Sequence, residues 1–276
     1  MIAHTITDLA ARAAHHPFLQ DHLTLDANGH VIAQFAEIKL GSAYEPIFDI
    51  SVNALAQSLS AAPHSAERFG DELGFQAQTL RQDHTQKEPR DARDPFGPIA
   101  SETELVTLDR LSRAMHAFNF FGAQRHGLLF LRVHERLLKS VKYDHGRHFS
   151  TVLLSFGLNP ARIVIELPSA AVAHRTFLEY LTKSYQRHGF RVAGNLPNAG
   201  QIMSMPDMAR LDFIMMDASS ALRDAVVKPL AGYAKRLRIP LIFTGISNEA
   251  QFELLRQFDV QFVQGPLFSP PLEVRR

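Results

Sequence analysis

Seven polar side chains fall at or near the ends of short, otherwise apolar runs of this sequence. A polar side chain that is buried needs a hydrogen-bond partner or a ligand. Carboxylates, amides and a guanidinium gathered in one place could bind a ligand, or they could bind one another, and the sequence leaves both alternatives open. These candidate site residues are Gln76, Arg132, Glu166, Asn195, Asp217, Thr244 and Gln264.

Other residue types narrow the chemistry further. The 276 residues include no cysteine, which excludes disulfides, zinc–thiolate sites and cysteine nucleophiles. Neither a P-loop nor a G-x-G-x-x-G pattern is present, so these two modes of nucleotide binding are not supported. The segment YDHGRH gathers Asp144, His145 and His148. This cluster is a candidate metal site, but its place between helices favours a solvated turn.

The candidate residues need a scaffold that brings strand ends together, and the sequence predicts one. Short runs rich in β-branched and aromatic residues alternate with longer amphipathic runs, most regularly from Leu128 onward. This alternation predicts an α/β fold, and about eight strands favour a closed, TIM-like (β/α)8 barrel over an open doubly wound sheet. The expected strands are Ala43–Ile50, Glu72–Leu80, Leu128–Val133, Arg162–Leu167, Phe190–Leu196, Leu211–Asp217, Pro240–Ile246 and Gln261–Gln264. In such a barrel the chemistry lies at the carboxyl ends of the strands, where the candidate residues fall.

The N-terminal segment is expected to extend this barrel. Apolar residues at helical spacing predict a helix over about Thr5–Leu23, and the Asn-Gly pair in LDANGHV predicts a small hairpin. We therefore expect a helix-and-hairpin extension over residues 1–30 and a barrel domain over residues 31–276. Two stretches interrupt the pattern: a helical insertion at Ser51–Asp71 and a charged, proline-containing loop at Arg81–Pro98.

Composition limits the class of partner. The formal net charge is +1, which favours neither a nucleic-acid nor a membrane-surface partner. The N-terminus lacks the basic start and apolar run of a signal peptide, and no apolar stretch reaches the roughly 20 residues of a membrane helix. We expect a soluble, cytoplasmic protein.

Several segments resemble motifs of EAL domains, the phosphodiesterases of the bacterial second messenger cyclic di-GMP. VQGPLFSPPL resembles the closing Q-G-Y-L-F-S-x-P, RIVIELP resembles L-E-I-T-E, and AYEPIFDI resembles Y-Q-P-I-V-D-L. RLDFIMMDAS is similar to P-D-x-L-K-I-D. The matches stand in the family's order over roughly Ala43–Leu272. The resemblance implies a modified (β/α)8 barrel whose first strand is antiparallel to its neighbour.

The family uses two divalent ions, Mg²⁺ or Mn²⁺, to hydrolyse one phosphodiester bond, and the resemblance places their ligands at the strand ends. Such ions need several oxygen ligands, mostly carboxylates. Most of the carboxylates that the family's motifs provide are replaced in this chain. The comparison of motifs therefore predicts that the chain holds no metal and no other cofactor, and that it has no catalytic residue. The positions that match the family's motifs are Glu166, Asp217, Gln264 and Gly265. The positions that depart from them are Gln76 for the Glu of E-A-L, Arg132 for an Asn, Asn195 and Leu196 for two Asp, Met215 for a Lys, and Ser169, Thr244 and Ser247 for three Glu.

Two functions from different classes follow. In the first, the barrel mouth binds cyclic di-GMP weakly and without metal, with Arg132 pairing to a phosphate; alternatively, Arg132 forms a salt bridge with Glu166. In the second, the protein is a regulator that binds a partner protein, with a homodimer as a further candidate assembly. The alternative to both is an active, metal-dependent cyclic di-GMP phosphodiesterase.

Overall fold

The computed structural model describes residues 4–51, 70–81, 96, 99, 101–140, 144–198, 200, 210–223, 225–258 and 260–268. The expected insertion at Ser51–Asp71 and the expected loop at Arg81–Pro98 lie almost wholly outside these residues. No helix in the described part of the chain combines the length and hydrophobicity that a membrane span requires.

Eight strands close into a barrel, as the alternation of elements predicts. The first, β3 (Ile38–Asp49), is antiparallel to both of its barrel neighbours, β4 (Asp71–Arg81) and β10 (Phe262–Val263). All other neighbouring barrel strands are parallel. The β3–β4 pairing closes the sheet, so the (β/α)8 prediction is confirmed and the open-sheet alternative is wrong. The remaining strands are β5 (Leu128–Arg132), β6 (Ile163–Leu167), β7 (Arg191–Asn195), β8 (Phe213–Asp217) and β9 (Leu241–Thr244).

Helices cover the outside of the barrel, and local sequence signals set several of their ends. Ser101 accepts a hydrogen bond from the backbone amide of Glu104, and Asn248 from that of Gln251, so both residues are N-caps. Gly189, at a φ of 86°, follows the C-cap residue His188 of the helix that ends at Arg187, where glycine is the preferred residue. The helices are α3 (Glu102–Gly122), α4 (Glu135–Ser140), α5 (Arg147–Ser155), α6 (Ser169–Val172), α7 (Arg175–Arg187), α9 (Ala218–Arg223), α10 (Val227–Leu237) and α11 (Glu249–Arg256), with a 3₁₀ turn at Pro160–Arg162.

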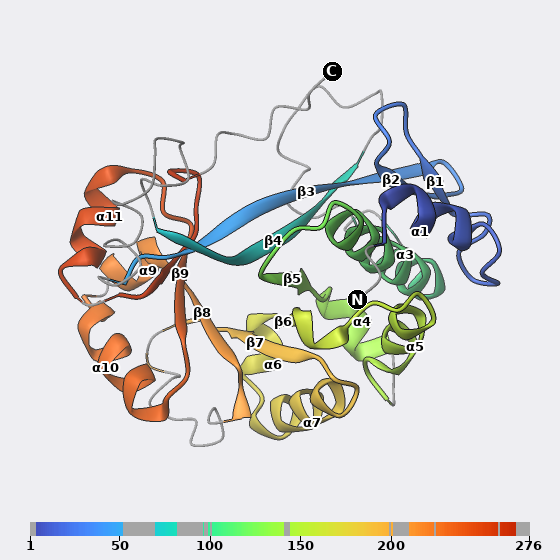
Figure 1. The fold of residues 1–276 in the computed structure, drawn as a ribbon. Helices are drawn as coiled ribbons and strands as arrows, with labels where there is room; N and C mark the ends of the chain where they lie inside the picture. The colour runs from blue at the N-terminus through green and yellow to red at the C-terminus, as the bar shows by residue number, and fades with distance from the viewer. Residues whose placement is uncertain are drawn as a thin grey trace.

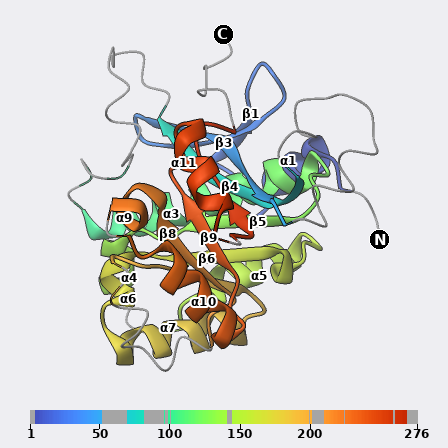
Figure 2. The same ribbon diagram turned by 90° about the vertical axis from the view of Figure 1, so that its left-hand side faces the viewer.

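The N-terminal elements extend the barrel on one side. Figure 1 shows α1 (Ile6–Ala13), β1 (Leu23–Leu25) and β2 (Val31–Phe35) beside the far ends of β3 and β4, opposite α10 and α11. Figure 2 views the same fold with α10 and α11 toward the reader. The predicted hairpin is confirmed, and β2 also pairs with β3, which makes a ten-stranded sheet.

The first helix is shorter than the sequence predicted. Thr5 and Asp8 form a capping box at its start, but the helix ends at Ala13 rather than near Leu23. Pro17 gives the physical reason, because a proline disfavours helical geometry in the residue before it and cannot donate a backbone hydrogen bond. The division at residue 30 remains a prediction.

Two apolar cores hold the barrel in place, one between the sheet and its helices and one inside the barrel. Side chains along a strand alternate between the two, because successive residues point to opposite faces. The interior core is formed by Ile47, Leu128, Phe130, Val164, Ala193, Phe213, Met215, Ile242 and Phe262.

Candidate functional site at the barrel mouth

The predicted site residues share one face of the sheet because of strand periodicity. Six of the seven lie two positions beyond a residue that points into the barrel, as Arg132 follows Phe130 and Glu166 follows Val164. The same spacing separates Gln264 from Phe262. Since side chains two apart on a strand point the same way, these polar groups are stacked on the apolar interior and form its mouth.

Four of the seven candidates lie together in a chain of polar contacts. Gln76 donates from Nε2 to both carboxylate oxygens of Glu166, at 2.8 and 2.9 Å. Gln264 donates from Nε2 to Oε1 of Gln76 at 2.8 Å and to Oε2 of Glu45 at 2.9 Å. Arg132 Nε lies 3.7 Å from Glu166 Oε2, which is an ion pair longer than a direct hydrogen bond. We call Glu45, Gln76, Arg132, Glu166 and Gln264 the mouth network.

The other three candidates lie at the mouth but are engaged with backbone atoms. Asn195 donates to the carbonyl of Leu167 at 3.2 Å, and Thr244 is 3.4 Å from the carbonyl of Met216. Asp217 accepts the amide of Ser220 in the first turn of α9 at 2.8 Å. These contacts fix the three side chains and leave the mouth network as the central polar feature of the site.

Gly245 lets the Asp217 carboxylate fold over the loop that follows β9. A Cβ atom at residue 245 would come within 2.8 Å of Asp217 Oδ2, and its φ of 74° also favours glycine. A side chain at this position would displace the carboxylate.

Burial separates the members of the mouth network. Glu166 is fully buried and Gln264 is 2% exposed, whereas the side chain of Arg132 is 62% exposed. Burial raises the pKa of Glu166, and Arg132 and the amide of Gln76 oppose that shift. Burial likewise raises the pKa of Glu45, opposed by the amides of Gln264 and Gln78.

Glu45 is a member of the mouth network that the sequence argument missed. Its register partner across the β3–β4 ladder is Gln76. The motif Y-Q-P has glutamine at the position of Glu45, and the motif E-A-L has glutamate at the position of Gln76. The two residue types are therefore exchanged between facing strands, a signal that was present in the quoted AYEPIFDI. The exchange keeps one carboxylate on this pair but moves it to the other strand.

The remaining departures from the motifs have apolar or local roles. Met215 is 1% exposed and lies in the interior core, and Leu196 is 6% exposed. Ser169 begins the short helix α6, and both the amide and the hydroxyl of Ser247 bond to Gln251. Positions that the motifs fill with ionisable groups thus serve packing and helix starts in this chain.

The donor set of the mouth does not fit a pair of dications. Metal ions of this kind need carboxylate oxygens with free lone pairs, but both oxygens of Glu166 accept hydrogen bonds from Gln76. Arg132 adds a positive charge beside the same carboxylate. Among the described residues, no group of three or more His, Cys, Asp or Glu side chains is placed to hold a metal ion.

Comparisons with known proteins agree with this architecture. A family model described as the EAL domain matches residues 98–271. No curated protein matches the chain significantly.

Several solved structures share the fold. The Bacillus subtilis YkuI protein, with an EAL domain and in complex with substrate c-di-GMP and calcium, has a TM-score of 0.63 and 16% identity over 83% of this chain and 55% of that one. A standalone versatile EAL protein from Vibrio cholerae O395, in its c-di-GMP-bound form, has a TM-score of 0.62 and 13% identity over 84% and 91% of the two chains. Klebsiella pneumoniae BlrP1, in a complex with manganese and cy-diGMP, has a TM-score of 0.62 and 17% identity over 82% and 54%. This chain thus spans about half the length of YkuI and of BlrP1, and at these identities the likeness shows the fold.

Proposed function

This chain belongs to the EAL domain family, and we propose that it is a member without phosphodiesterase activity that acts as a regulatory protein in cyclic di-GMP-related signalling. The observation that carries the proposal is the mouth network. In it, the Gln76 amide donates hydrogen bonds to Glu166, the carboxylate that the family's motifs assign to metal binding, and Arg132 forms an ion pair with it. The main mode of action in this proposal is binding to a partner protein.

Charge supports the loss of two-metal hydrolysis. Two dications would bring four positive charges to a network that holds two carboxylates and one guanidinium. A unit charge 4 Å from a like charge costs about 4 kcal/mol at an effective dielectric of 20, and a dication beside Arg132 doubles that cost. The mouth therefore favours its own internal pairing over bound metal.

Binding of cyclic di-GMP without metal is a secondary part of the proposal, and we expect it to be weak. YkuI and the Vibrio cholerae protein are described with c-di-GMP bound, which motivates the test. Arg132 is the exposed cation that could pair with a phosphate. However, the buried Oε1 atom of Gln264 has no hydrogen-bond partner among the described residues, and Glu45 lies beside it. This excess of acceptors disfavours an anionic ligand.

The proposed partner protein is not identified by the mouth. The segments that the sequence offered for this role, residues 51–71 and 81–98, lie almost wholly outside the described residues, so the proposal rests on the altered site chemistry.

The test is incubation of the purified protein with cyclic di-GMP and Mn²⁺, with an active EAL phosphodiesterase as the positive control. We expect no linear dinucleotide above background. Calorimetry with cyclic di-GMP, with and without Mg²⁺, should show weak or undetectable binding that the metal does not strengthen. Formation of the linear dinucleotide would support the alternative, an active metal-dependent phosphodiesterase, and would overturn the proposal.

A further inference from the structure

A second polar site lies on the outer wall of the barrel, away from the mouth. A cavity of about 40 Å³ opens between α3, α5 and α7. It is lined by Arg110 and Arg113 of α3, His148 of α5, Tyr185 of α7 and the turn that contains Asp144. One water molecule needs about 10 to 15 Å³ by the same measure, so the cavity holds about three or four water-sized groups. We call this site the outer cavity.

Several donors that line the outer cavity have no acceptor in the described part of the chain. Arg113 is only 7% exposed, yet its Nε–H has no hydrogen-bond partner there. The buried Nε2 atom of His148 has no partner there either, and it is a donor in the tautomer that carries the ring proton on this nitrogen. A buried donor without an acceptor is costly, because the group has lost its water without replacement. These atoms therefore indicate a missing acceptor.

The start of α5 adds backbone donors at the same place. Gly146 is its N-cap residue and provides no side-chain cap, while His148 and Phe149, in the first turn, line the outer cavity. The first amides of a helix have no partner within the helix and carry partial positive charge, so they favour an anion. The amide of Arg147 donates to the carbonyl of Asp144 at 3.2 Å, so the amides that remain for a ligand are those of His148 and Phe149.

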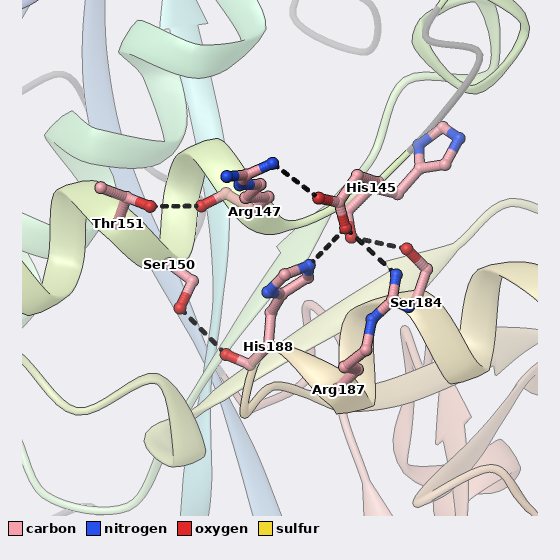
Figure 3. A network of polar contacts seen from close by, with 8 residues as sticks. His145, Arg147, Ser150, Thr151, Ser184, Arg187 and His188 are labelled. Carbon is pink, nitrogen blue, oxygen red and sulfur yellow. Dashed lines mark hydrogen bonds and ion pairs between the residues drawn. The ribbon is translucent and has the colours of Figure 1, made fainter.

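The charge around the outer cavity is positive. Asp109 is held by Arg113, and Asp144 is surrounded by basic groups. His188 Nε2 lies 2.6 Å, Arg187 3.1 Å and Arg147 3.5 Å from a carboxylate oxygen of Asp144. In Figure 3, the side chains of Arg147, at the start of α5, and of Arg187 and His188, at the end of α7, point toward the same carboxylate, which is that of Asp144.

The predicted solvated turn at YDHGRH is thus wrong in part. His145 is 3% exposed, and its carbonyl accepts a hydrogen bond from Ser184 of α7, as Figure 3 also shows. Among the described residues, Arg147 and Arg187 share the one carboxylate of Asp144, and Arg110 and Arg113 share that of Asp109, which leaves an excess of two positive charges. The positive charge also disfavours the metal ion that the cluster of Asp144 and histidines suggested.

We propose that the outer cavity is a binding site for a phosphate group, held by Arg110, Arg113, His148 and the first amides of α5. The group supplies acceptor oxygens to the unpartnered donors and negative charge to the uncompensated arginines. Its four oxygens match the three or four water-sized positions of the cavity. Inorganic phosphate and the terminal phosphate of a small monoester share this chemistry.

The test is calorimetric titration of the full chain with inorganic phosphate at constant ionic strength, with acetate as the comparison anion. We expect saturable phosphate binding by the wild type and at least tenfold weaker binding by Arg110→Gln. Arg256→Gln is the matched control, because it removes the same charge from an exposed position on α11 that pairs with Glu253. That variant should bind phosphate as the wild type does.

A second measurement places the ligand and identifies its source. The ring resonance of His148, assigned with His148→Gln, should shift on addition of phosphate. A parallel titration with a nucleoside 5′-monophosphate distinguishes a free ion from a monoester, and binding of either supports the site. Equal binding of phosphate and acetate, equal affinity of Arg110→Gln and wild type, or an unmoved His148 resonance would each overturn it. None of these readouts depends on the phosphodiesterase assay, so this proposal and the proposed function can fail separately.

Discussion

The barrel mouth and the outer cavity are both polar sites surrounded by apolar residues. The mouth has an excess of hydrogen-bond acceptors, whereas the outer cavity has an excess of donors and of positive charge. At the mouth, amide groups and Arg132 serve two carboxylates, and the atom left over is an acceptor, Gln264 Oε1. Among the described residues around the outer cavity, arginines outnumber aspartates, and the buried side-chain atoms without a partner are Arg113 Nε and His148 Nε2. The leftover group decides which ligand each site favours, since a buried polar atom gains most from a partner of opposite kind.

The difference between unpartnered acceptors at the mouth and unpartnered donors at the outer cavity indicates which of the two sites favours an anion. The motifs direct attention to the mouth, yet in this chain the mouth is the site with excess acceptors. The outer cavity carries the excess of positive charge, although no motif marks it. The contrast can be broken or sharpened by substitutions at both sites.

Gln76→Glu should have the largest effect. It places a third carboxylate beside Glu166, where Gln76 now donates two hydrogen bonds. We expect a loss of about 4 kcal/mol in the free energy of unfolding at pH 8 in EDTA, from like-charge repulsion at about 4 Å. Urea denaturation measures the loss.

The double variant Glu45→Gln/Gln76→Glu is the matched control. It moves the carboxylate to β4 without changing the number of carboxylates on this pair of strands. The repulsion between residues 45 and 76 is removed while that between residue 76 and Glu166 stays, so part of the stability should return. A single variant as stable as the wild type would show that the mouth is not governed by charge.

Glu166→Ala should have the next largest effect. The substitution leaves the buried amide of Gln76 without its acceptor, and a lost hydrogen bond to a charged group is worth about 1.5 to 3 kcal/mol. We expect a loss of about 2 to 3 kcal/mol by urea denaturation, and a smaller one for Glu166→Gln, which keeps an acceptor oxygen. Equal losses in the two variants would contradict the role of the hydrogen bonds.

The two sites should also respond oppositely to pH, with smaller effects. Burial, with Arg110 and Arg113, lowers the pKa of His148 to about 4, so the unfolded chain binds its proton more readily. This residue therefore destabilises the fold as pH falls from about 6.5 toward about 4. His148→Gln should lose less stability than the wild type across that range.

Glu166 has the opposite sign. Its pKa is raised by burial, so the folded chain binds the proton more readily and stability falls as pH rises above the usual carboxyl value. Glu166→Gln should remove that fall. Unfolding free energies of the two variants and the wild type from pH 4 to 8 check both signs, and parallel curves for all three proteins would contradict them.

Much of the fold could be predicted because its signals are local. The ends of each of the eight barrel strands lie within two residues of the predicted ends, apart from the longer start of β3. Ser101 and Asn248, residue types that favour N-caps, each cap the helix that follows them. The first helix was predicted too long because apolar spacing was given more weight than Pro17. The Arg132–Glu166 ion pair was one of two alternatives that the sequence left open, and the structure contains it.

Parts of both sites were not predictable in this way, because they depend on which strands and helices become neighbours. Glu45 joins the mouth because β3 runs antiparallel to β4 and carries its side chain to the same end as Gln76. Arg110 and His148 meet because α3 and α5 pack on the same part of the wall.

The sequence by itself determined the barrel and the types of residue at its strand ends, since periodicity and turn signals act over a few neighbouring positions. Only the tertiary structure decided which of those polar groups bond to one another and which are left without a partner. Hydrogen bonds and burial depend on distances between residues far apart in the chain, as the 90 positions between Gln76 and Glu166 illustrate.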